Sequence, residues 1–538
     1  MEYVDYIKPT RVLSCSSNVN NVEHLFLSNY SHNMLCPPSY TSIKGKGYLV
    51  LDFEKEYFGG IRISLGHNLP TINKPYLRIR FGESLMEANS ELGYKNSTND
   101  HSTRDMTVYM SSFSDMSWGS TGFRFVRLDF LEDINYQIEN ITLAFHHEEE
   151  PSLIFKSSNP ELDAIIEAAK RTLWINKQDG IYFEGAKRDQ HIWAGDLYPE
   201  LTAAIYSFSS IDNIKNCIKF LIDNYPENTW YNEIPSYNAW LILTLLRYFE
   251  LTGDVNETYL RCISSNLVMF KRLIENDFVL DNVDKWGLAF FDWSTLDTPS
   301  SAYGIRYLFA LTLNKVIESS YVSNSDKELA ESLLNRLDNV EGIVTNSKAV
   351  NSLELLLNKY DKKPLIDQIK QDGCKGFTVF LTCLILEALA NNNELEFAYK
   401  SMLDYFGGML EIGGTILFEE FNLSDLDNSC KLDEMPAEGK LDFHGDHGEQ
   451  CYAGYRKSLC HGWACGVIPF VIEHLVGLRI EKGKYVKINP NILDLDFIEA
   501  DIPTSKGNIH INIKQVNGVT DYDVRLPEHF ILERINNG

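Results

Sequence analysis

The chain has 538 residues, with 75 acidic side chains against 49 basic ones and a formal net charge of −26. This balance argues against a nucleic-acid partner, which needs clustered Lys and Arg, and against binding to anionic membranes. A neutral or cationic ligand fits better. At about 100–200 residues per domain the length predicts roughly three domains, and a hydrophobic fraction of 44% is enough for a sizeable core.

The first residues and the cysteines indicate the compartment. Residues 1–20 show no basic segment followed by an apolar one, so we expect no cleaved secretory signal. The apolar stretch 377–390 is too short to span a bilayer and is typical of a buried helix. The ten cysteines show no paired spacing, as in free thiols of a reducing compartment. The prediction is a cytoplasmic protein with no membrane partner; its oligomeric state stays open, and a homo-oligomer is possible.

Residues 1–150 are β-rich in pattern. Runs such as Gly47–Phe53 and Arg124–Leu131 are separated by Gly, Asn and Ser clusters. In the second run, apolar Val126, Leu128 and Phe130 alternate with charged residues, which indicates a half-buried strand. We therefore expect a β-sandwich of about a dozen short strands.

A helical region starts near Asn159. Asn159-Pro160-Glu161 is typical of a helix start, with Asn at the N-cap and Pro in the first turn. Helix-like segments then follow one another up to about residue 478. They cover residues 198–208, 211–223, 236–252, 256–275, 303–320, 326–337, 352–360, 376–390, 394–406 and 460–477. Periodicity does not choose among a helical bundle, a solenoid and an α/α toroid.

The strand pattern returns after about residue 483. Residues 509–513 alternate between Ile and polar side chains, and the turn dipeptides Gly507-Asn508 and Asn517-Gly518 flank them. The predicted domains are thus a β-sandwich over 1–150, a large helical domain over 151–480 and a small C-terminal β-domain over 481–538.

The densest polar and aromatic segment is 182–200, Tyr-Phe-Glu-Gly-Ala-Lys-Arg-Asp-Gln-His-Ile-Trp-Ala-Gly-Asp-Leu-Tyr-Pro-Glu. Its Gly and Pro residues predict a loop on a helical scaffold. Sugars need carboxylates that bind hydroxyls and move protons, and aromatic rings that pack on apolar ring faces. The competing interpretation is an exposed, salt-bridged loop.

This segment resembles the active-site signature of glycoside hydrolase family 78, the α-L-rhamnosidases, in the branch with the motif (acid)-Gly-x-Lys-Arg-Asp-x-x-x-Trp-x-Gly-Asp. The resemblance implies a catalytic (α/α)6 barrel flanked by β-domains, which matches the layout above. It implies that Asp189 is the general acid, and that Glu184, Arg188, Trp193 and Asp196 bind the sugar. Many relatives have Glu where this chain has Asp189, and often Asp where it has Glu184.

Three further segments resemble motifs of the same family. Residues 413–421 hold Glu419, which would be the general base; otherwise Glu419 and Glu420 would be ordinary surface acids. Residues 458–464 hold His461, which would face the sugar or else be a core histidine at a helix start. Asp292-Trp293 would line the pocket, although a Trp beside a helix end is more often core. A fourth match, residues 237–240, is weaker.

A metal site is a competing interpretation of residues 444–465. The potential ligands there are His444, His447, Cys451, Cys460, His461 and Cys465. They lack the tight pair spacing of zinc sites, so we expect no metal and no cofactor, and residues 442–447 are expected to form a polar loop.

The resemblance implies an inverting exo-glycosidase whose acid and base lie about 6.5–9.5 Å apart with water between them. Glu184 and Asp196 would raise the pKa of the acid by like-charge repulsion. Arg188 would lower that pKa if it pointed the same way. It is instead expected to point away from Asp189, toward Glu184 or sugar hydroxyls, because neighbours in an extended segment face opposite sides. The substrates would be rhamnose-containing glycosides or oligosaccharides. Two alternatives stay open: a hydrolase or lyase acting on uronic acids, with Lys187 and Arg188 as the cations of the motif, and a non-catalytic carbohydrate-binding relative.

Overall fold

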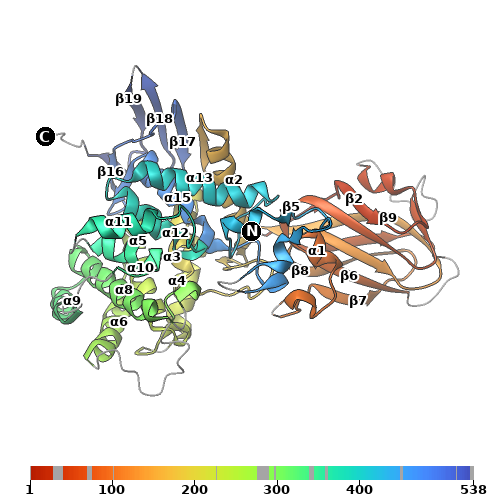
Figure 1. The fold of residues 1–538 in the computed structure, drawn as a ribbon, viewed down its shortest axis with the longest axis horizontal. Helices are drawn as coiled ribbons and strands as arrows, with labels where there is room; N and C mark the ends of the chain where they lie inside the picture. Colours follow the sequence, from red (N-terminus) through yellow and green to blue (C-terminus); the bar gives the residue numbers. More distant parts are fainter. Residues whose placement is uncertain are drawn as a thin grey trace.

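The structure is a computed structural model that describes residues 2–27, 40–68, 75–100, 102–225, 227–275, 290–295, 298–337, 344–357, 361–448, 452–516 and 518–533. The molecule is elongated, with the N-terminal strands at one end and the helices and C-terminal strands at the other (Figure 1).

The described residues of the N-terminal region form one sheet of nine strands. These are β1 (Tyr3–Ile7), β2 (Arg11–Cys15), β3 (Val19–Asn20), β4 (Thr41–Lys44), β5 (Gly47–Leu65), β6 (Tyr76–Gly82), β7 (Asp105–Tyr109), β8 (Ser114–Phe130) and β9 (Asn135–His147). Their order is β3-β4-β9-β5-β8-β6-β7, with β1 on β9 and β2 on β5. A helical turn, α1 (Leu85–Asn89), follows β6, and the 3₁₀ turns η1 (Val22–Phe26) and η2 (Tyr94–Asn96) lie in loops.

Several strands of this sheet are much longer than the short strands predicted: β5 has 19 residues, β8 has 17 and β9 has 13. Strand β5 continues through irregularities between Asp52 and Tyr57 and between Gly59 and Ile61, while keeping its pairing with β8. Bulges bend a strand without ending its ladder, so turn-like residues inside β5 do not separate strands. The alternation over Val126, Leu128 and Phe130 is confirmed, because all three are buried. Both halves of β5 contribute to one apolar core.

The helical region contains a closed series of helices. The main elements are α2 (Pro160–Asn176), α3 (Leu197–Ser207), α4 (Asp212–Asn224), α5 (Pro235–Thr252), α6 (Glu257–Glu275), α8 (Pro299–Glu318), α9 (Asn324–Leu337), α10 (Lys348–Leu357), α11 (Lys362–Lys370), α12 (Val379–Ala390) and α13 (Leu395–Glu411). Helix α3 contacts α5, α5 contacts α8, α8 contacts α10, and α10 contacts α12. The 3₁₀ helix η7 (Gly462–Gly466) contacts both α12 and α3 and closes the series.

The sequences of the helices agree with these positions. Helix α12 is apolar on nearly all sides, as a helix enclosed by others must be. Helix α4 instead buries one face, with Ile214, Cys217, Ile218 and Leu221 at helical spacing. The predicted N-cap is confirmed, because the Asn159 side chain accepts a hydrogen bond from the backbone N–H of Glu161 (2.9 Å).

Two helix predictions differ from the structure. The predicted helix 460–477 is η7 followed by α15 (Val467–Phe470) and a π-turn, η8 (Val471–Leu475). A regular α-helix is disfavoured there because Pro469 has no backbone N–H to donate and because Gly462 and Gly466 are poor helix formers. Helix α11 was not among the predicted segments; its N-cap is Asp361.

The C-terminal strands form two sheets. They are β15 (Leu478–Glu481), β16 (Tyr485–Ile488), β17 (Phe497–Ile502), β18 (Ile509–Val516), β19 (Val519–Arg525) and β20 (Ile531–Leu532). The strand predicted at 509–513 is confirmed, with its isoleucines buried. Strand β10 (Ile154–Ser157) pairs antiparallel with β17, so this segment of the predicted helical domain belongs to a C-terminal sheet.

The helices and cysteines of the described part of the chain bear on the predicted compartment. No helix in it is long and apolar enough to cross a membrane. Its cysteines are all free thiols, and most are buried.

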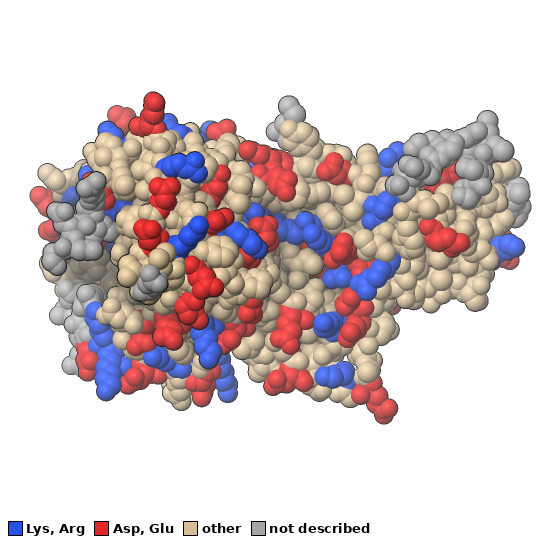
Figure 2. All heavy atoms as spheres, turned by 90° about the horizontal axis from the view of Figure 1, so that it is seen from above, with Lys and Arg blue, Asp and Glu red and all other residues tan. Residues whose placement is uncertain are grey.

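The surplus of acidic residues is dispersed on the face drawn in Figure 2. Acidic side chains lie among basic ones there, and most of both kinds lie over the helical half of the molecule. The negative charge is therefore not gathered into one block on this face.

Candidate active site

The loop at 182–200 is buried and held from two sides. It leaves the short strand β12 (Ile181–Tyr182) and enters α3. The backbone of Gly185 forms a bridge with His461, and the N–H of Gly462 donates to the carbonyl of Glu184 (2.7 Å). On the other side, β8 donates from the N–H of Gly122 to the carbonyl of Ala186 (2.9 Å). An exposed, salt-bridged loop is therefore excluded, and both β8 and the 458–464 segment position the motif.

Arg188 joins the two carboxylates with predicted catalytic roles. Its Nη2 donates to Glu419 Oε1 (2.6 Å), its Nη1 forms an ion pair with Asp189, and its Nε donates to the carbonyl of Arg456 (2.7 Å). The expectation that Arg188 points away from Asp189 is wrong. The backbone turns here, with φ of 62° at Asp189 and 53° at Gln190, so the alternation of an extended segment does not apply.

Glu419 is a buried and ionised carboxylate. Its Oε2 accepts from the backbone N–H of Ser458 (2.6 Å), and its carbonyl accepts from Trp463 Nε1 (3.1 Å). Burial acts to raise the pKa of Glu419, but the Arg188 guanidinium, His461 and the Ser458 N–H outweigh it, so the pKa lies below its usual value. Glu419 and Glu420 are both buried, which rules out the interpretation as surface acids. An ionised, held carboxylate is suited to act as a base.

Two neighbouring carboxyl groups retain protons more readily. Burial, followed by repulsion from Asp196 and Asp189, raises the pKa of Glu184 well above its usual value. Glu184 Oε2 accepts from the N–H of His191 (2.7 Å). Burial raises the pKa of Asp196 to about 7, although a hydrogen bond from the Tyr237 hydroxyl (3.2 Å) opposes this. The site therefore combines one ionised carboxylate with two that tend to be protonated.

His461 lies between two of these acids. Its Nε2 is 3.9 Å from Asp196 Oδ2 and 4.0 Å from Glu419 Oε1, and its ring packs on Trp463. Burial lowers the pKa of His461 to about 4, so the imidazole is neutral at pH 7. The neutral ring can exchange a hydrogen bond with a ligand hydroxyl. It does not act as a second cation beside Arg188 at Glu419.

A row of aromatic rings borders the carboxylates. Consecutive ring centroids lie 5.3–6.3 Å apart in the order Trp193, Tyr237, Phe290, Trp293 and Tyr452. Tyr452 also lies against the Arg188 guanidinium, with Cζ 4.0 Å from the ring centroid. Trp193 and Trp293 are partly exposed. Phe290 and Tyr452 were not found from the sequence, because single aromatic residues outside a motif carry no signal of their own.

Asp292 shapes the turn that presents Trp293. It is buried, its Oδ2 accepts from Ser294 Oγ (2.6 Å), and its carbonyl accepts from the N–H of Thr295 (3.0 Å). Burial raises the pKa of Asp292. These contacts hold the 3₁₀ turn η4 (Trp293–Thr295).

The predicted polar loop at 442–447 is wrong. Residues 443–446 form the short helix α14 (Phe443–Asp446), and His444 is fully buried. The reason is a set of partners distant in sequence: Ser84 Oγ lies 2.9 Å from His444 Nδ1, and the carbonyl of Lys457 lies 3.1 Å from Nε2. Cys451 lies outside the described residues.

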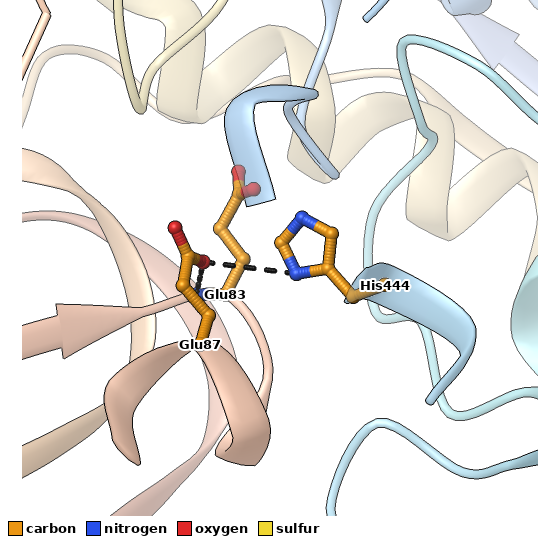
Figure 3. Close-up of side chains that lie close together, drawn as sticks. All are labelled: Glu83, Glu87 and His444. Atoms are coloured by element: carbon orange, nitrogen blue, oxygen red, sulfur yellow. Dashed lines mark hydrogen bonds and ion pairs between the residues drawn. The ribbon is translucent and has the colours of Figure 1, made fainter. Parts of the chain in front are cut away.

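Glu83, Glu87 and His444 form the one group among the described residues whose ligand atoms are close enough for a metal ion (Figure 3). Lys187 already supplies the positive charge there, since its Nζ lies 3.0 Å from Glu83 Oε2 and 3.2 Å from Glu87 Oε1. Ser84 engages Nδ1 of His444. These residues therefore do not fit a metal site.

Comparison with solved structures identifies the fold. A GH78 family rhamnosidase of Bacillus sp. GL1 superposes with a TM-score of 0.70 and 16% identity, over 91% of this chain and 53% of that one. An α-L-rhamnosidase from Dictyoglumus thermophilum has a TM-score of 0.69 and 17% identity, over 98% and 57%. A Klebsiella oxytoca rhamnosidase with rhamnose bound has a TM-score of 0.66 and 15% identity, over 88% and 96%.

The extent of these matches differs. The chain spans little more than half the length of the Bacillus and Dictyoglumus proteins but nearly all of the Klebsiella one. No protein-family model and no curated protein sequence matches the chain. At such low identity the likeness is one of fold, and activity has to be argued from the site. The chain has the fold of the α-L-rhamnosidases of known structure.

Proposed function

We propose that the chain is an inverting α-L-rhamnosidase of glycoside hydrolase family 78 that releases terminal rhamnose from glycosides or oligosaccharides. The closed series α3, α5, α8, α10, α12 and η7 would be the inner ring of an (α/α)6 barrel, with the C-terminal strands as a separate β-domain. The observation that carries the proposal is the joining of Asp189 and Glu419 by one buried guanidinium, inside a border of aromatic rings.

Glu419 and Asp189 would divide the two carboxyl roles of an inverting hydrolase. Glu419, ionised by Arg188 and the Ser458 N–H, would take a proton from the attacking water. By its place in the motif that resembles the family's signature, Asp189 would be the acid that protonates the leaving oxygen. The two carboxylates contact different nitrogens of Arg188, so the guanidinium lies between them.

The remaining residues would bind the sugar. Glu184, Asp196 and neutral His461 offer groups for hydroxyls, and Trp193, Trp293 and Tyr452 offer faces for the apolar side and methyl group of rhamnose. Asp292 would act indirectly, through the turn that carries Trp293.

The alternative substrate, a uronic acid, is less compatible with the cations of the motif. Lys187 is held by Glu83, Glu87 and two backbone carbonyls, and Arg188 is shared between Asp189 and Glu419. The charges of Lys187 and Arg188 are thus both neutralised by protein carboxylates. A substrate carboxylate would need a positive charge that is not already neutralised in this way. A neutral sugar meets no such demand.

The proposal is tested by hydrolysis of aryl α-L-rhamnosides and aryl uronides by the wild-type protein, Asp189→Asn and Glu419→Gln. We expect activity on rhamnosides and a loss of about 10²–10⁴-fold in kcat for each variant. Asp254→Asn, which alters a surface acid paired with Lys215, is the matched control and should retain activity. Proton NMR should show the inverted anomer first. A wild-type protein inert on rhamnosides, or two fully active variants, would contradict the proposal.

A further inference from the structure

A carboxylate of the N-terminal sheet region lies behind the candidate active site. Glu83 is in the turn between β6 and α1, and its side chain is fully buried (0% exposed). In Figure 3 its carboxylate lies near Glu87 and His444, with the ligand atoms of the three residues within 4.8 Å of one another. Its Oε1 accepts from Ser458 Oγ (2.9 Å), and its Oε2 accepts from the N–H of Leu459 (2.7 Å) and from Lys187 Nζ (3.0 Å). Glu83 therefore holds two segments that are distant from it in sequence.

The first of these segments holds Glu419 directly. The side chain of Ser458 donates to Glu83, and the backbone N–H of the same residue donates to Glu419 Oε2 (2.6 Å). The N–H of Glu419 in turn donates to the carbonyl of Ser458 (3.1 Å). A single residue thus connects the carboxylate of the sheet region to the carboxylate of the site.

The second segment holds the other oxygen of Glu419. Lys187 binds Glu83 and the carbonyls of Tyr455 (2.7 Å) and Lys457 (2.6 Å). The next residue, Arg188, donates to Glu419 Oε1. Two hydrogen bonds that orient Glu419, one to each carboxylate oxygen, therefore come from residues that Glu83 anchors, either directly or through the adjacent position.

We propose that Glu83 is a positioning residue for the general base: it fixes Ser458 and Lys187 so that both oxygens of Glu419 keep their donors. This inference rests on the proposed function, in which Glu419 activates water. It makes the N-terminal sheet region part of the catalytic arrangement. It also gives the buried ion pair of Glu83 and Lys187 a role that needs no metal ion.

The charged groups around the two carboxylates set the sign of the expected effect. Glu419 faces Arg188, His461 and Asp196, and Glu83 faces Lys187, Glu87 and Glu56. The Ser458 N–H lowers the pKa of Glu419. If Ser458 is no longer held, that pKa rises, and the acidic limb of the kcat/KM profile moves to higher pH. A general loss of stability would lower activity without moving this limb.

The test compares Glu83→Gln with the matched variant Glu87→Gln. Each variant removes one buried carboxylate that contacts Lys187. Glu83 also binds Ser458 and Leu459. Glu87 has no such contact among the described residues; its Oε2 accepts from the N–H of Glu83. An amide keeps one acceptor atom and loses the other. We expect Glu83→Gln to lower kcat by about tenfold or more, with a smaller change in KM and an acidic limb at higher pH. Glu87→Gln should leave the limb in place.

Ser458→Ala is the second variant, because it removes the bond to Glu83 while keeping the N–H to Glu419. Ser458→Ala should also move the acidic limb of the kcat/KM profile to higher pH. If Glu83→Gln does not fold, Ser458→Ala alone tests the role of Glu83. The inference is overturned if Ser458→Ala, or a folded Glu83→Gln, keeps the wild-type limb, or if Glu87→Gln shifts it equally. Wild-type protein without rhamnosidase activity would instead overturn the proposed function.

Discussion

Replacement of Arg188 by Met tests whether the charges of the site compensate one another as the structure indicates. Arg188 and Glu419 are both nearly inaccessible, with side chains 5% and 4% exposed. The substitution removes the positive charge and leaves Glu419 buried without its main partner. Breaking a buried ion pair by removing one member costs about 3–5 kcal/mol, so we expect a loss of this size in the free energy of unfolding at neutral pH.

The pH dependence of this loss has a definite sign. In the wild-type protein the pKa of Glu419 lies below its usual 4.5, so its contribution to stability is present above that value and is lost as the pH falls. In Arg188→Met, burial dominates and the pKa rises. The variant should therefore differ most from the wild type at neutral pH, and the difference should shrink toward acidic pH, where Glu419 is protonated in both proteins.

The measurement is guanidinium denaturation of both proteins between about pH 4 and 8. Arg456→Met is the matched control, since Arg456 also lies on the Tyr452 ring but pairs with Asp100 at the surface. An exposed pair contributes about 0–1 kcal/mol. If Arg188→Met is no less stable than Arg456→Met, or if its deficit is independent of pH, Arg188 does not compensate the buried charge of Glu419.

Three further predictions concern single residues. Because the pKa of Asp196 is raised to about 7, its ionisation opposes folding between pH 3.8 and about 7. In Asp196→Asn the free energy of unfolding, measured by denaturation, should therefore fall less over this range than in the wild type. An unchanged dependence of that free energy on pH would contradict the prediction. Trp293→Ala should raise KM for aryl rhamnosides more than it lowers kcat, because it removes a packing surface; an unchanged KM would exclude contact with the sugar. Gly195→Ala should lower kcat, because a Cβ would lie 2.5 Å from Tyr237 and displace the hydroxyl that binds Asp196; wild-type kinetics would show that Tyr237 can shift freely.

Much of the secondary structure follows from local sequence. The N-cap at Asn159, the apolar sequence of α12 and the alternation at Val126–Phe130 each lie within a few residues, so the physical cause is visible in the chain itself. The long β5 was not predictable in this way. Whether residues such as Gly59 end a strand or form a bulge depends on the partner strand, which lies far along the chain.

The chemical groups of the site could be read from the chain: the acids, the arginine and the tryptophan of the 182–200 segment, and Glu419. Their contacts with one another could not, because they depend on how distant segments fold together. Arg188 meets Glu419 across 231 positions, and Ser458 meets Glu83 across 375. The turn at Asp189 and Gln190 reverses the direction expected for Arg188. A side chain's charge is set by its type, but its pKa and direction depend on burial and on partners that only the fold brings together.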